Sequence, residues 1–492
     1  MKIIFYFLLF ILSPLINSQS QFQDFIDHVN SLPTIQEKTA AVDSFMIYAR
    51  SAGIPFIEDS TANFIYLGNY SSVTVAGDFN GWSANAWMLT RLAQTNFWYH
   101  SQTFEMDARL DYKFVLNGSN WILDPENPNT CPGGFGPNSE LAMPLYIQPW
   151  EIQYNPNIPH GTVVSKSIYS TNVSVTYQLN IYLPPGYDTS SALTYPTAYF
   201  QDGAEYISLG AAVKVLDNLI DRNKLKPLIA VFVTPNNRNE EYAFSKRNQY
   251  RLFFVNELVP YIDSNYKTIA SADYRLVLGD SFGGNISALI SYNHPEVFGL
   301  CGLHSAAFWP NNYETLEMIT SGPIKDIKWS SIWGTYEGIF PELRTFRDFL
   351  IGNSYELDWL ERPEGHSWGL WRASLDRMLE YFFPADPSWL SPDYNQIASD
   401  FSLFQNFPNP FNPTTKIKYS IPNVETHRDA SLQVVLKIYD MLGREVATLV
   451  NQEMQPGVYE IEFNAPQLVS GVYYYQLKAG TFVETKKMII VR

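Results

Sequence analysis

The sequence predicts a protein of several domains, in which a central α/β domain is flanked by two all-β sandwiches. A chain of 492 residues is too long for one hydrophobic core. In its middle, the apolar run 274–278 leads through a glycine-rich turn into the helical pattern 284–290, as in an α/β sheet. On both sides, at 72–76 and again after residue 401, apolar and polar residues alternate as in half-buried strands. The expected segments are, in order, a leader at 1–20, a helical segment at 21–59, a sandwich at 60–150, the α/β domain at 158–385, a linker at 386–400 and a second sandwich at 401–492.

The leader has the features of a secretory signal peptide. Lys2 supplies a positive charge, the stretch 3–12 is unbroken and apolar, and Ser18 and Ser20 offer small residues for cleavage. This stretch is too short to cross a membrane, and no later one reaches the roughly 18 apolar residues that a span needs. We therefore expect an exported protein without a membrane span.

Charge and cysteine content narrow the classes of partner. The chain has 33 basic and 49 acidic residues, a net charge of −16, which disfavours nucleic acids and anionic membranes as partners. Its two cysteines are Cys131 and Cys301. Because Cys301 lies in an apolar strand-like run and Cys131 in a distant loop, we expect two free thiols rather than one disulfide.

The region before the α/β domain combines a helical pattern with a small sandwich. Apolar residues recur at helical spacing within 21–59, and we expect this segment only to pack. The sandwich at 60–150 has turn signals at Asn80-Gly81 and Asn117-Gly118. It resembles the immunoglobulin-like E-set sandwiches that precede many enzyme domains. The runs that carry this resemblance are 75–82, 111–115 and 120–125.

The E-set resemblance implies a possible sugar site. In glycogen-binding relatives, the residues that match Trp82, Lys113 and Trp121 form a sugar platform. Stacking indoles and an amine that binds hydroxyls suit carbohydrate physically. Modules of this kind also serve only to pack on the catalytic domain and shape its cleft, and that alternative stays open.

Ser281 is the candidate nucleophile. It lies at the centre of Gly279-Asp280-Ser281-Phe282-Gly283, a G-x-S-x-G sequence between the predicted strand and helix. Such a turn exposes the serine hydroxyl above the sheet, and only glycines on either side let the backbone close so tightly. The N–H groups that begin the helix point to the same place. This setting predicts an α/β-hydrolase nucleophile, and the alternative is a glycine-rich structural turn.

His366 is the candidate general base. In α/β-hydrolases the acid and then the histidine follow the serine in the chain, which leaves four of the seven histidines. His294 lies at the end of the nucleophile helix, His427 falls in the C-terminal module, and His304 follows a strand, where it lines the pocket or only satisfies its loop. His366 follows the strand-like run 357–361, where the last strand of such a sheet delivers its base. The alternative is a loop histidine without a role.

Glu337 is the candidate acid of the triad. It closes the run 332–338, a short apolar strand that ends in a turn two elements after the nucleophile. Its task would be to hold the tautomer of His366 and to stabilise the imidazolium. Asp358, in the middle of a strand, is the second candidate, and a solvated turn carboxylate is the alternative for Glu337.

The region 162–384 resembles the putative-esterase family, which contains feruloyl esterases, esterase D and enterochelin esterase. The family more often has aspartate where this chain has Glu337. The resemblance implies that the loop at Gly203 and Ala204 supplies one oxyanion N–H group and Phe282 the other. The runs that carry it are 179–187, 195–203, 254–262, the nucleophile turn and Gly365-His366-Ser367-Trp368.

The C-terminal sandwich resembles the sorting domain of type IX secretion. Its signature runs are 406–415, 439–446 and 471–475, after a proline-rich linker at 386–400. The resemblance implies export across the outer membrane, the secretion machinery as a partner and removal of the module. No catalysis is expected there.

Together these patterns predict a secreted serine esterase that acts on feruloyl or acetyl esters of plant polysaccharide, without a cofactor or metal ion. Trp309, Trp333 and Trp368 could line its pocket, although core packing explains each of them as well. Arg238 is a cation at the carboxyl end of the sheet, able to orient a sugar or a single carboxylate. The alternative reactions or roles are hydrolysis of a siderophore trilactone and, in another class, carbohydrate binding without catalysis.

Overall fold

The structure is a computed structural model that describes residues 20–134, 136–385, 401–406, 408–421, 432–454, 457–480 and 482–491. Nearly all of the predicted signal peptide and the predicted linker lie outside the described residues. The chain divides into two compact units, Met1–Asp386 and Pro387–Arg492. Among the described residues, no helix combines the length and the apolar character that crossing a bilayer requires.

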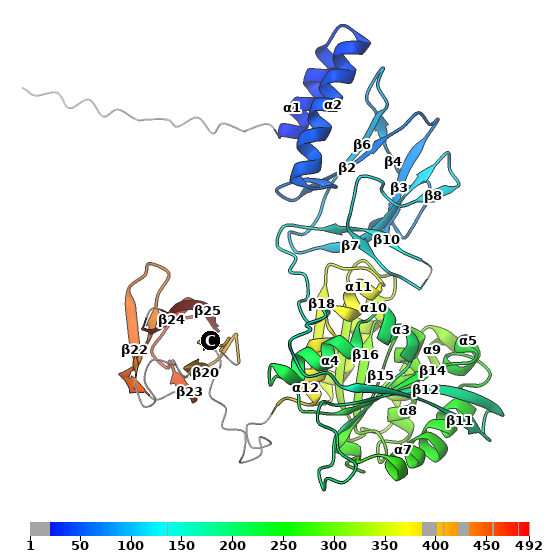
Figure 1. Cartoon of the computed structure of the whole chain (residues 1–492), viewed down its shortest axis with the longest axis vertical. Helices are drawn as coiled ribbons and strands as arrows, with labels where there is room; N and C mark the ends of the chain where they lie inside the picture. Colours follow the sequence, from blue (N-terminus) through cyan, green and yellow to red (C-terminus); the bar gives the residue numbers. More distant parts are fainter. Residues whose placement is uncertain are drawn as a thin grey trace, which may run out of the picture. The chain divides into compact units, whose positions relative to one another are not determined.

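Two helices open the first unit and pack on a sheet (Figure 1). A capping box between Thr34 and Glu37 starts the second of them. The prediction of a helical segment as far as residue 59 is wrong at its end, because Phe56–Glu58 pairs as a strand with 61–63. Gly53 and Pro55 account for this, since neither favours continuation of a helix. The elements are α1 (Gln21–Ser31), α2 (Ile35–Ala52) and β1 (Phe56–Glu58).

Two sheets packed face to face form what we call the N-terminal sandwich, residues 56–142. One sheet has the strand order β1-β2-β6-β5, and the other β4-β3-β7-β10-β9 with β8 paired to β7. Side chains from both sheets share one hydrophobic cluster, which includes Phe64 from the first and Phe114 from the second. The immunoglobulin-like class remains a prediction. The strands are β2 (Thr61–Leu67), β3 (Val73–Gly77), β4 (Trp87–Met88), β5 (Thr90–Arg91), β6 (Phe97–Thr103), β7 (Arg109–Leu116), β8 (Asn120–Ile122), β9 (Thr130–Cys131) and β10 (Asn138–Ala142).

The α/β domain is built on a sheet of eight strands in the order β11-β12-β14-β13-β15-β16-β17-β18. From β14 onward neighbouring strands are parallel, and β11 and β12 add an antiparallel edge. The carboxyl ends of the parallel strands therefore meet at one edge, where an α/β sheet places its site. The strands are β11 (Thr162–Ser170), β12 (Val175–Leu183), β13 (Thr197–Phe200), β14 (Ile229–Thr234), β15 (Arg275–Asp280), β16 (Leu300–His304), β17 (Lys328–Gly334) and β18 (Leu357–Arg362).

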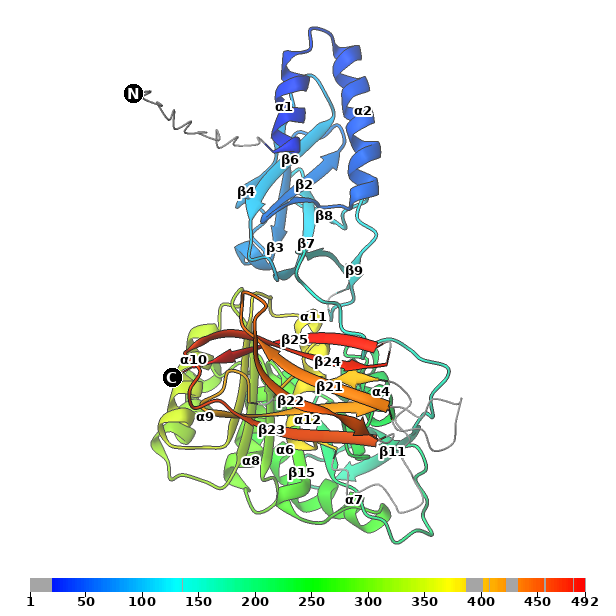
Figure 2. The same cartoon turned by 90° about the vertical axis from the view of Figure 1, so that its left-hand side faces the viewer.

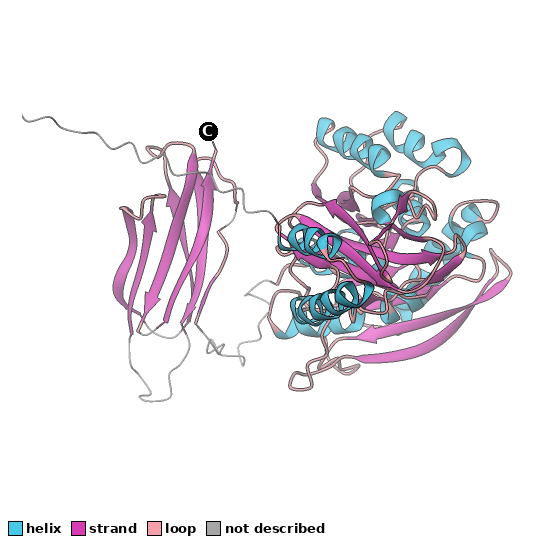
Figure 3. Ribbon diagram, turned by 90° about the horizontal axis from the view of Figure 1, so that it is seen from above, coloured by secondary structure: helices cyan, strands magenta, loops and turns pink. Residues whose placement is uncertain are grey.

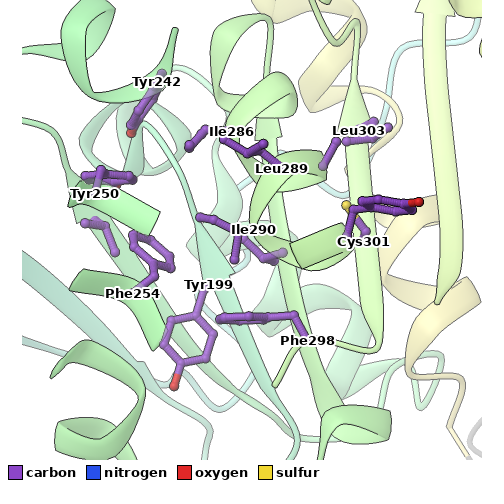
Figure 4. Close-up of a cluster of buried hydrophobic side chains, with 14 of the residues drawn as sticks. Tyr199, Tyr242, Tyr250, Phe254, Ile286, Leu289, Ile290, Phe298, Cys301 and Leu303 are labelled. Carbon is purple, nitrogen blue, oxygen red and sulfur yellow. The ribbon is translucent and has the colours of Figure 1, made fainter. Parts of the chain in front are cut away.

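Helices cover both faces of this sheet. Figure 4 shows Ile286, Leu289 and Ile290 of the nucleophile helix α8 inside one cluster, beside Tyr199 and Phe298. A second cluster on the other face holds α3, α4, α11 and α12. The helices of the domain are α3 (Gly203–Ser208), α4 (Ala212–Asp221), α5 (Arg238–Tyr242), α6 (Arg247–Phe253), a π-helical turn (Phe254–Leu258), α7 (Val259–Asn265), α8 (Phe282–Asn293), α9 (Pro310–Ser321), α10 (Phe340–Gly352), α11 (Trp368–Arg372) and α12 (Leu375–Phe382), with short 3₁₀ turns at Asp78–Asn80 and Ala272–Tyr274.

Cys131 and Cys301 are both buried and free, which confirms the prediction of two thiols. Cys301 belongs to β16, and Figure 4 shows its sulfur among apolar side chains. Burial raises the pKa of both thiols, so neither is a reactive thiolate.

The described part of the second unit consists of strands in two sheets, as Figure 3 shows in magenta. One sheet has the order β19-β20-β23, and the other β22-β21-β24-β25. A cluster of its own, centred on side chains such as Leu436, Tyr475 and Met488, makes this unit a separate folding body. The strands are β19 (Ser402–Leu403), β20 (Thr414–Ile421), β21 (Leu432–Tyr439), β22 (Glu445–Met454), β23 (Gly457–Asn464), β24 (Gly471–Ala479) and β25 (Phe482–Ile490).

Candidate active site

Ser281 lies on a sharp turn between a buried strand and a buried helix. β15 ends at Asp280 and α8 begins at Phe282. Ser281 has φ 54° and ψ −119°, a conformation that costs a non-glycine residue energy and persists only where its surroundings impose it. A side chain at Gly279 would come within 2.5 Å of the Gly283 backbone, so the turn closes only with glycine there. The geometry is that of a nucleophile elbow, as the sequence predicted.

His366 and Glu337 meet at the same edge of the sheet. Glu337 lies in the turn after β17, and its Oε2 is 2.7 Å from Nδ1 of His366. Its other oxygen accepts hydrogen bonds of 2.6 Å from both Ser305 Oγ and the Gly334 N–H group. The Glu337 side chain is fully buried. The carboxylate therefore has one orientation, in which it holds the imidazole ring.

The environment of His366 favours its protonated form. Burial lowers the pKa of His366, but the charge and hydrogen bond of Glu337, with smaller effects of Asp280 and Asp78, outweigh this and raise the pKa overall. The edge of the ring packs against Trp371, with centroids 5.1 Å apart. The His366 side chain is still 37% exposed, so it can reach a bound molecule.

Ser281 and His366 line the same cavity, although no hydrogen bond joins them among the described residues. Catalytic hydrogen bonds of this kind are often long in an unliganded site and shorten when substrate binds.

The other candidate acid and histidines lie elsewhere. Asp358 is at the opposite end of β18 and forms an ion pair with Arg377, so it cannot orient His366. His304 is fully buried, and burial lowers its pKa to about 3, so it stays neutral beside the hydroxyl of Tyr206. His294 caps α8, and His427 lies outside the described residues.

Two helix starts flank Ser281. Phe282 is the first residue of α8 and Gly203 the first of α3, and a helix leaves its first N–H groups without partners inside the helix. Gly203 lies so close to β14 that a side chain there would meet the Phe232 backbone at 2.4 Å. Ala204 follows it in the same turn. Phe282 lines the cavity, whereas Gly203 and Ala204 are not among its lining residues, although Asp202 and Glu205 on either side of them are.

Arg238 fixes the turn that precedes α3. Its guanidinium donates two hydrogen bonds to Asp202, of 2.8 and 2.7 Å, and also approaches Asp280. Asp202 has φ 49°, a strained value that this clamp maintains. Burial, and then the charge of Asp202, raise the pKa of Asp280 to about 8, and Arg238 opposes this shift. Arg238 thus lines the cavity as predicted, but its charge is paired with Asp202.

A cavity of about 740 Å³ opens in front of Ser281. Its far wall comes from the N-terminal sandwich, where Trp82 and Trp121 stack with centroids 6.4 Å apart and Lys113 lies beside them. The residues that the resemblance singled out as a sugar platform therefore face the candidate nucleophile. The lining residues are Asp78, Trp82, Asp111, Lys113, Trp121, Gly133, Gly134, Gly136, Asn138, Asp202, Glu205, Arg238, Asn239, Asp280, Ser281, Phe282, His366, Ser367, Trp368 and Trp371.

The predicted aromatic wall is wrong in part. Trp333 is fully buried in the core, stacks on Trp359 and donates its indole N–H group to Glu361, so it does not reach the cavity. Trp309 is 45% exposed and lies against Phe282, next to the cavity but outside its lining. Trp368 lines the cavity as predicted.

Sequence reasoning missed three residues that shape the site. The hydroxyl of Ser305 donates to Oε1 of Glu337, and its oxygen accepts a hydrogen bond of 2.9 Å from the indole N–H group of Trp371. Asp78 comes from the N-terminal sandwich and faces the histidine loop. No spacing pattern links these residues, because they lie on different elements. Of the three, only Asp78 falls in a run that carries a resemblance, the E-set run 75–82.

Two regions of the chain match known protein families. Residues 170–348 match the putative esterase family. This part of the chain is similar to that esterase family. Residues 405–491 match a secretion system C-terminal sorting domain. This sorting domain belongs to type IX secretion and indicates export across the outer membrane to the cell surface or the extracellular space.

Two curated relatives illustrate the range of the esterase family. An endo-1,4-beta-xylanase/feruloyl esterase of Xylanibacter ruminicola is 30% identical over 226 residues, which are 44% of this chain and 31% of that protein. An iron(III) enterobactin esterase of Escherichia coli is 28% identical over 193 residues, 38% of this chain and 46% of that protein. The chain thus spans less than half of the length of each of these two relatives.

Solved esterase structures share the fold. The enterobactin esterase of Shigella flexneri superposes with a TM-score of 0.56 at 21% identity and covers 65% of this chain and 92% of its own. The ferric enterobactin esterase of Salmonella typhimurium gives 0.57 at 18% identity, with 65% and 93% covered. At such identities the likeness concerns the fold alone.

Proposed function

We propose that the protein is a secreted carboxylic-ester hydrolase in which Ser281 is the nucleophile, His366 the general base and Glu337 the group that orients it. The observation that carries this proposal is the 2.7 Å contact between His366 and a fully buried Glu337, on the same cavity as the strained Ser281. The match of residues 170–348 to the putative esterase family supports the same reaction.

The reaction follows from the positions of these groups. The Ser281 hydroxyl attacks the ester carbonyl while His366 takes its proton, and Glu337 stabilises the imidazolium. The N–H groups of Phe282 and of Gly203 or Ala204 would hold the oxyanion, and each such donor is worth about 10²–10³ in rate. His366 returns the proton to the leaving alcohol, and water then releases the acid from Ser281 by the same steps reversed.

We further propose feruloyl or acetyl esters of plant polysaccharide as the substrates. A cavity of about 740 Å³ is large enough for an aryl acid together with sugar units. Trp368 offers an apolar surface beside the nucleophile, and the stacked Trp82 and Trp121, with Lys113, would contact the sugar. The relative that is named a xylanase and feruloyl esterase supports this class of substrate.

The second candidate substrate is a siderophore trilactone, supported by the relative that is named an iron(III) enterobactin esterase. The charge of the cavity argues against it. Of the lining residues, Lys113 and Arg238 are the basic ones besides His366, and Arg238 is already paired with Asp202. The cavity therefore offers little free positive charge to a multiply anionic ferric catecholate, which the net charge of −16 would also repel.

The ratio of kcat/KM for sugar esters to that for ferric enterobactin tests the assignment. Methyl ferulate, p-nitrophenyl acetate, acetylated xylan and ferric enterobactin are compared at low ionic strength, where charge effects are largest. We expect the aryl or acetyl esters to be cleaved with the higher kcat/KM. A preference of tenfold or more for ferric enterobactin, about 1.4 kcal/mol in the transition state, would overturn the polysaccharide assignment.

A further inference from the structure

The loop that carries His366 is held from the N-terminal sandwich as well as from its own domain. Arg109, at the start of β7, is fully buried. Its backbone N–H group donates to the carbonyl of Pro363 at 3.1 Å, and its Nη1 donates to Ser367 Oγ at 3.2 Å. These two contacts bracket His366, three residues after the first and one before the second. Figure 1 and Figure 2 show β7 next to α11, which follows the loop.

Acidic side chains of the sandwich fix the direction of Arg109. Its Nε donates to Glu140 at 2.9 Å, and its Nη2 lies 2.6 Å from Asp111. The charge is thus neutralised inside its own domain, and the remaining nitrogen is directed at the histidine loop. A buried guanidinium between two carboxylates has little freedom to move, because displacing it would leave their charges uncompensated.

Two glycines of the histidine loop, Gly365 and Gly369, lie directly against side chains of the sandwich. At Gly365, an added Cβ would lie 2.0, 2.2 and 2.4 Å from Cγ, Oδ2 and Oδ1 of Asp78, its three nearest atoms. At Gly369, it would lie 2.0 Å from Nη1 of Arg109. Gly365 has no left-handed backbone angle that would itself require glycine. The three atoms nearest to a Cβ built on Gly365 all belong to Asp78, so Asp78 occupies the space that a side chain there would need.

Asp78 is itself held in place. Its Oδ2 accepts from the Asp111 N–H group at 2.7 Å, and its Oδ1 accepts from the indole of Trp82 at 3.0 Å. On the other side of the loop, the Tyr336 N–H group donates to the Glu364 carbonyl at 3.1 Å. The histidine loop therefore lies between the turn after β17 and the sandwich, with close contacts on both.

We propose that the N-terminal sandwich positions the general base: Asp78 and Arg109 clasp the loop 363–369, and Gly365 is glycine because Asp78 occupies the space of a side chain. Asp78 and Arg109 are positioning residues, since they act through His366. This inference rests on the proposed ester hydrolysis, and it assigns to the sandwich a part in catalysis that is separate from any contact with sugar.

The groups that face His366 set its response to pH. They are Glu337 from the turn after β17, Asp280 from the end of β15, and Asp78 from the sandwich. Asp78 in turn faces Asp111 and Arg109; burial, then the charge of Asp111, raise the pKa of Asp78 to about 7. Because the carboxyl of Asp78 is then partly protonated in the pH range where His366 titrates, its removal should shift the acid limb of kcat/KM only slightly to lower pH.

A double-mutant cycle between Gly365 and Asp78 tests the proposal on the full chain with p-nitrophenyl acetate. Gly365→Ala should lower kcat about 10²-fold with KM within about threefold, because the loop must move by the order of an ångström. Asp78→Ala removes the three atoms nearest to the added Cβ, so Gly365→Ala with Asp78→Ala should regain at least about tenfold in kcat over Gly365→Ala alone. Gly352→Ala is the matched control, since a Cβ there meets nothing within 4 Å.

The outcomes separate the alternatives. Wild-type kcat in Gly365→Ala, or a double variant no better than Gly365→Ala, would overturn the clasp. If Gly365→Ala fails to fold, Ser367→Ala decides, because it removes only the bond from Arg109: a lower kcat with unchanged KM supports the proposal, and an unchanged kcat contradicts it. Activity of the wild type that is lost in Ser281→Ala establishes the proposed function independently of these variants.

Discussion

At the scale of single residues, the contacts of Glu337 show how the proposed triad accommodates a glutamate as its acid. Glu337 lies three residues after β17, and its longer side chain reaches back to accept from the Gly334 N–H group and from Ser305. Ser305 is held in turn by Trp371. Each oxygen of the carboxylate thus has a partner, so the extra methylene does not loosen the ring of His366.

The pKa of His366 gives the first prediction at this scale. Because that pKa is raised, the acid limb of kcat/KM in the wild type should lie above the ordinary histidine value of about 6.5. Glu337→Gln removes the charge that outweighs burial, so the limb should move to lower pH, and kcat should fall by about 10²–10⁴. A pH profile of kcat/KM measures both effects.

Asp358→Asn serves as the control for this prediction. Asp358 is a carboxylate on the neighbouring strand that pairs with Arg377 and not with His366. Its variant should keep both the acid limb and kcat. A silent Glu337→Gln beside an inactive Asp358→Asn would transfer the role of the acid to Asp358.

At the scale of elements, local patterns predicted what local forces determine. The turn at Ser281 could be predicted because a strand, two glycines and a helix lie within a few residues of one another. Trp333 could not be placed, because an apolar strand that is buried on both faces carries no alternation to show which side chains reach the site. Asp78 and Arg109 were not predicted as part of the site, because their contact with the loop of His366 depends on how two domains dock.

The sandwich wall of the cavity supplies a prediction that separates sugar contact from catalysis. Trp121 is 40% exposed and lines the cavity without bonding to Asp78, unlike Trp82. Trp121→Ala should leave kcat for p-nitrophenyl acetate unchanged. It should weaken retention on insoluble feruloylated or acetylated xylan, because the variant lacks the indole face on which a sugar ring would stack. Pull-down of the protein by the polysaccharide measures this.

The matched control for Trp121 is Trp150. It is 42% exposed, but it lies near Arg222 and Lys224, away from the cavity lining. Trp150→Ala should therefore be retained like the wild type. Equal retention of Trp121→Ala on every polysaccharide would leave the sandwich with a purely structural role.

At the scale of the whole molecule, the proposed catalytic residues and the secretion sorting domain lie in separate units of the chain. Every predicted catalytic residue lies in the unit Met1–Asp386, while the sorting domain at 405–491 lies in the unit Pro387–Arg492, with a hydrophobic core of its own. The order of domains could be predicted, because each has its own period of apolar residues and its own motif. The cavity could not, because its walls come from two domains of the first unit.

The kcat of Ser281→Ala tests the central claim most directly, measured for methyl ferulate and p-nitrophenyl acetate with the wild type and Ser264→Ala beside it. Ser264 is an exposed serine of α7, bonded to the Pro260 carbonyl and distant from the cavity lining. We predict that Ser281→Ala lowers kcat by about 10⁴–10⁶ while its circular dichroism is unchanged, and that Ser264→Ala keeps the wild-type value. A folded Ser281→Ala protein with near-native turnover would contradict the assignment of this serine as the nucleophile.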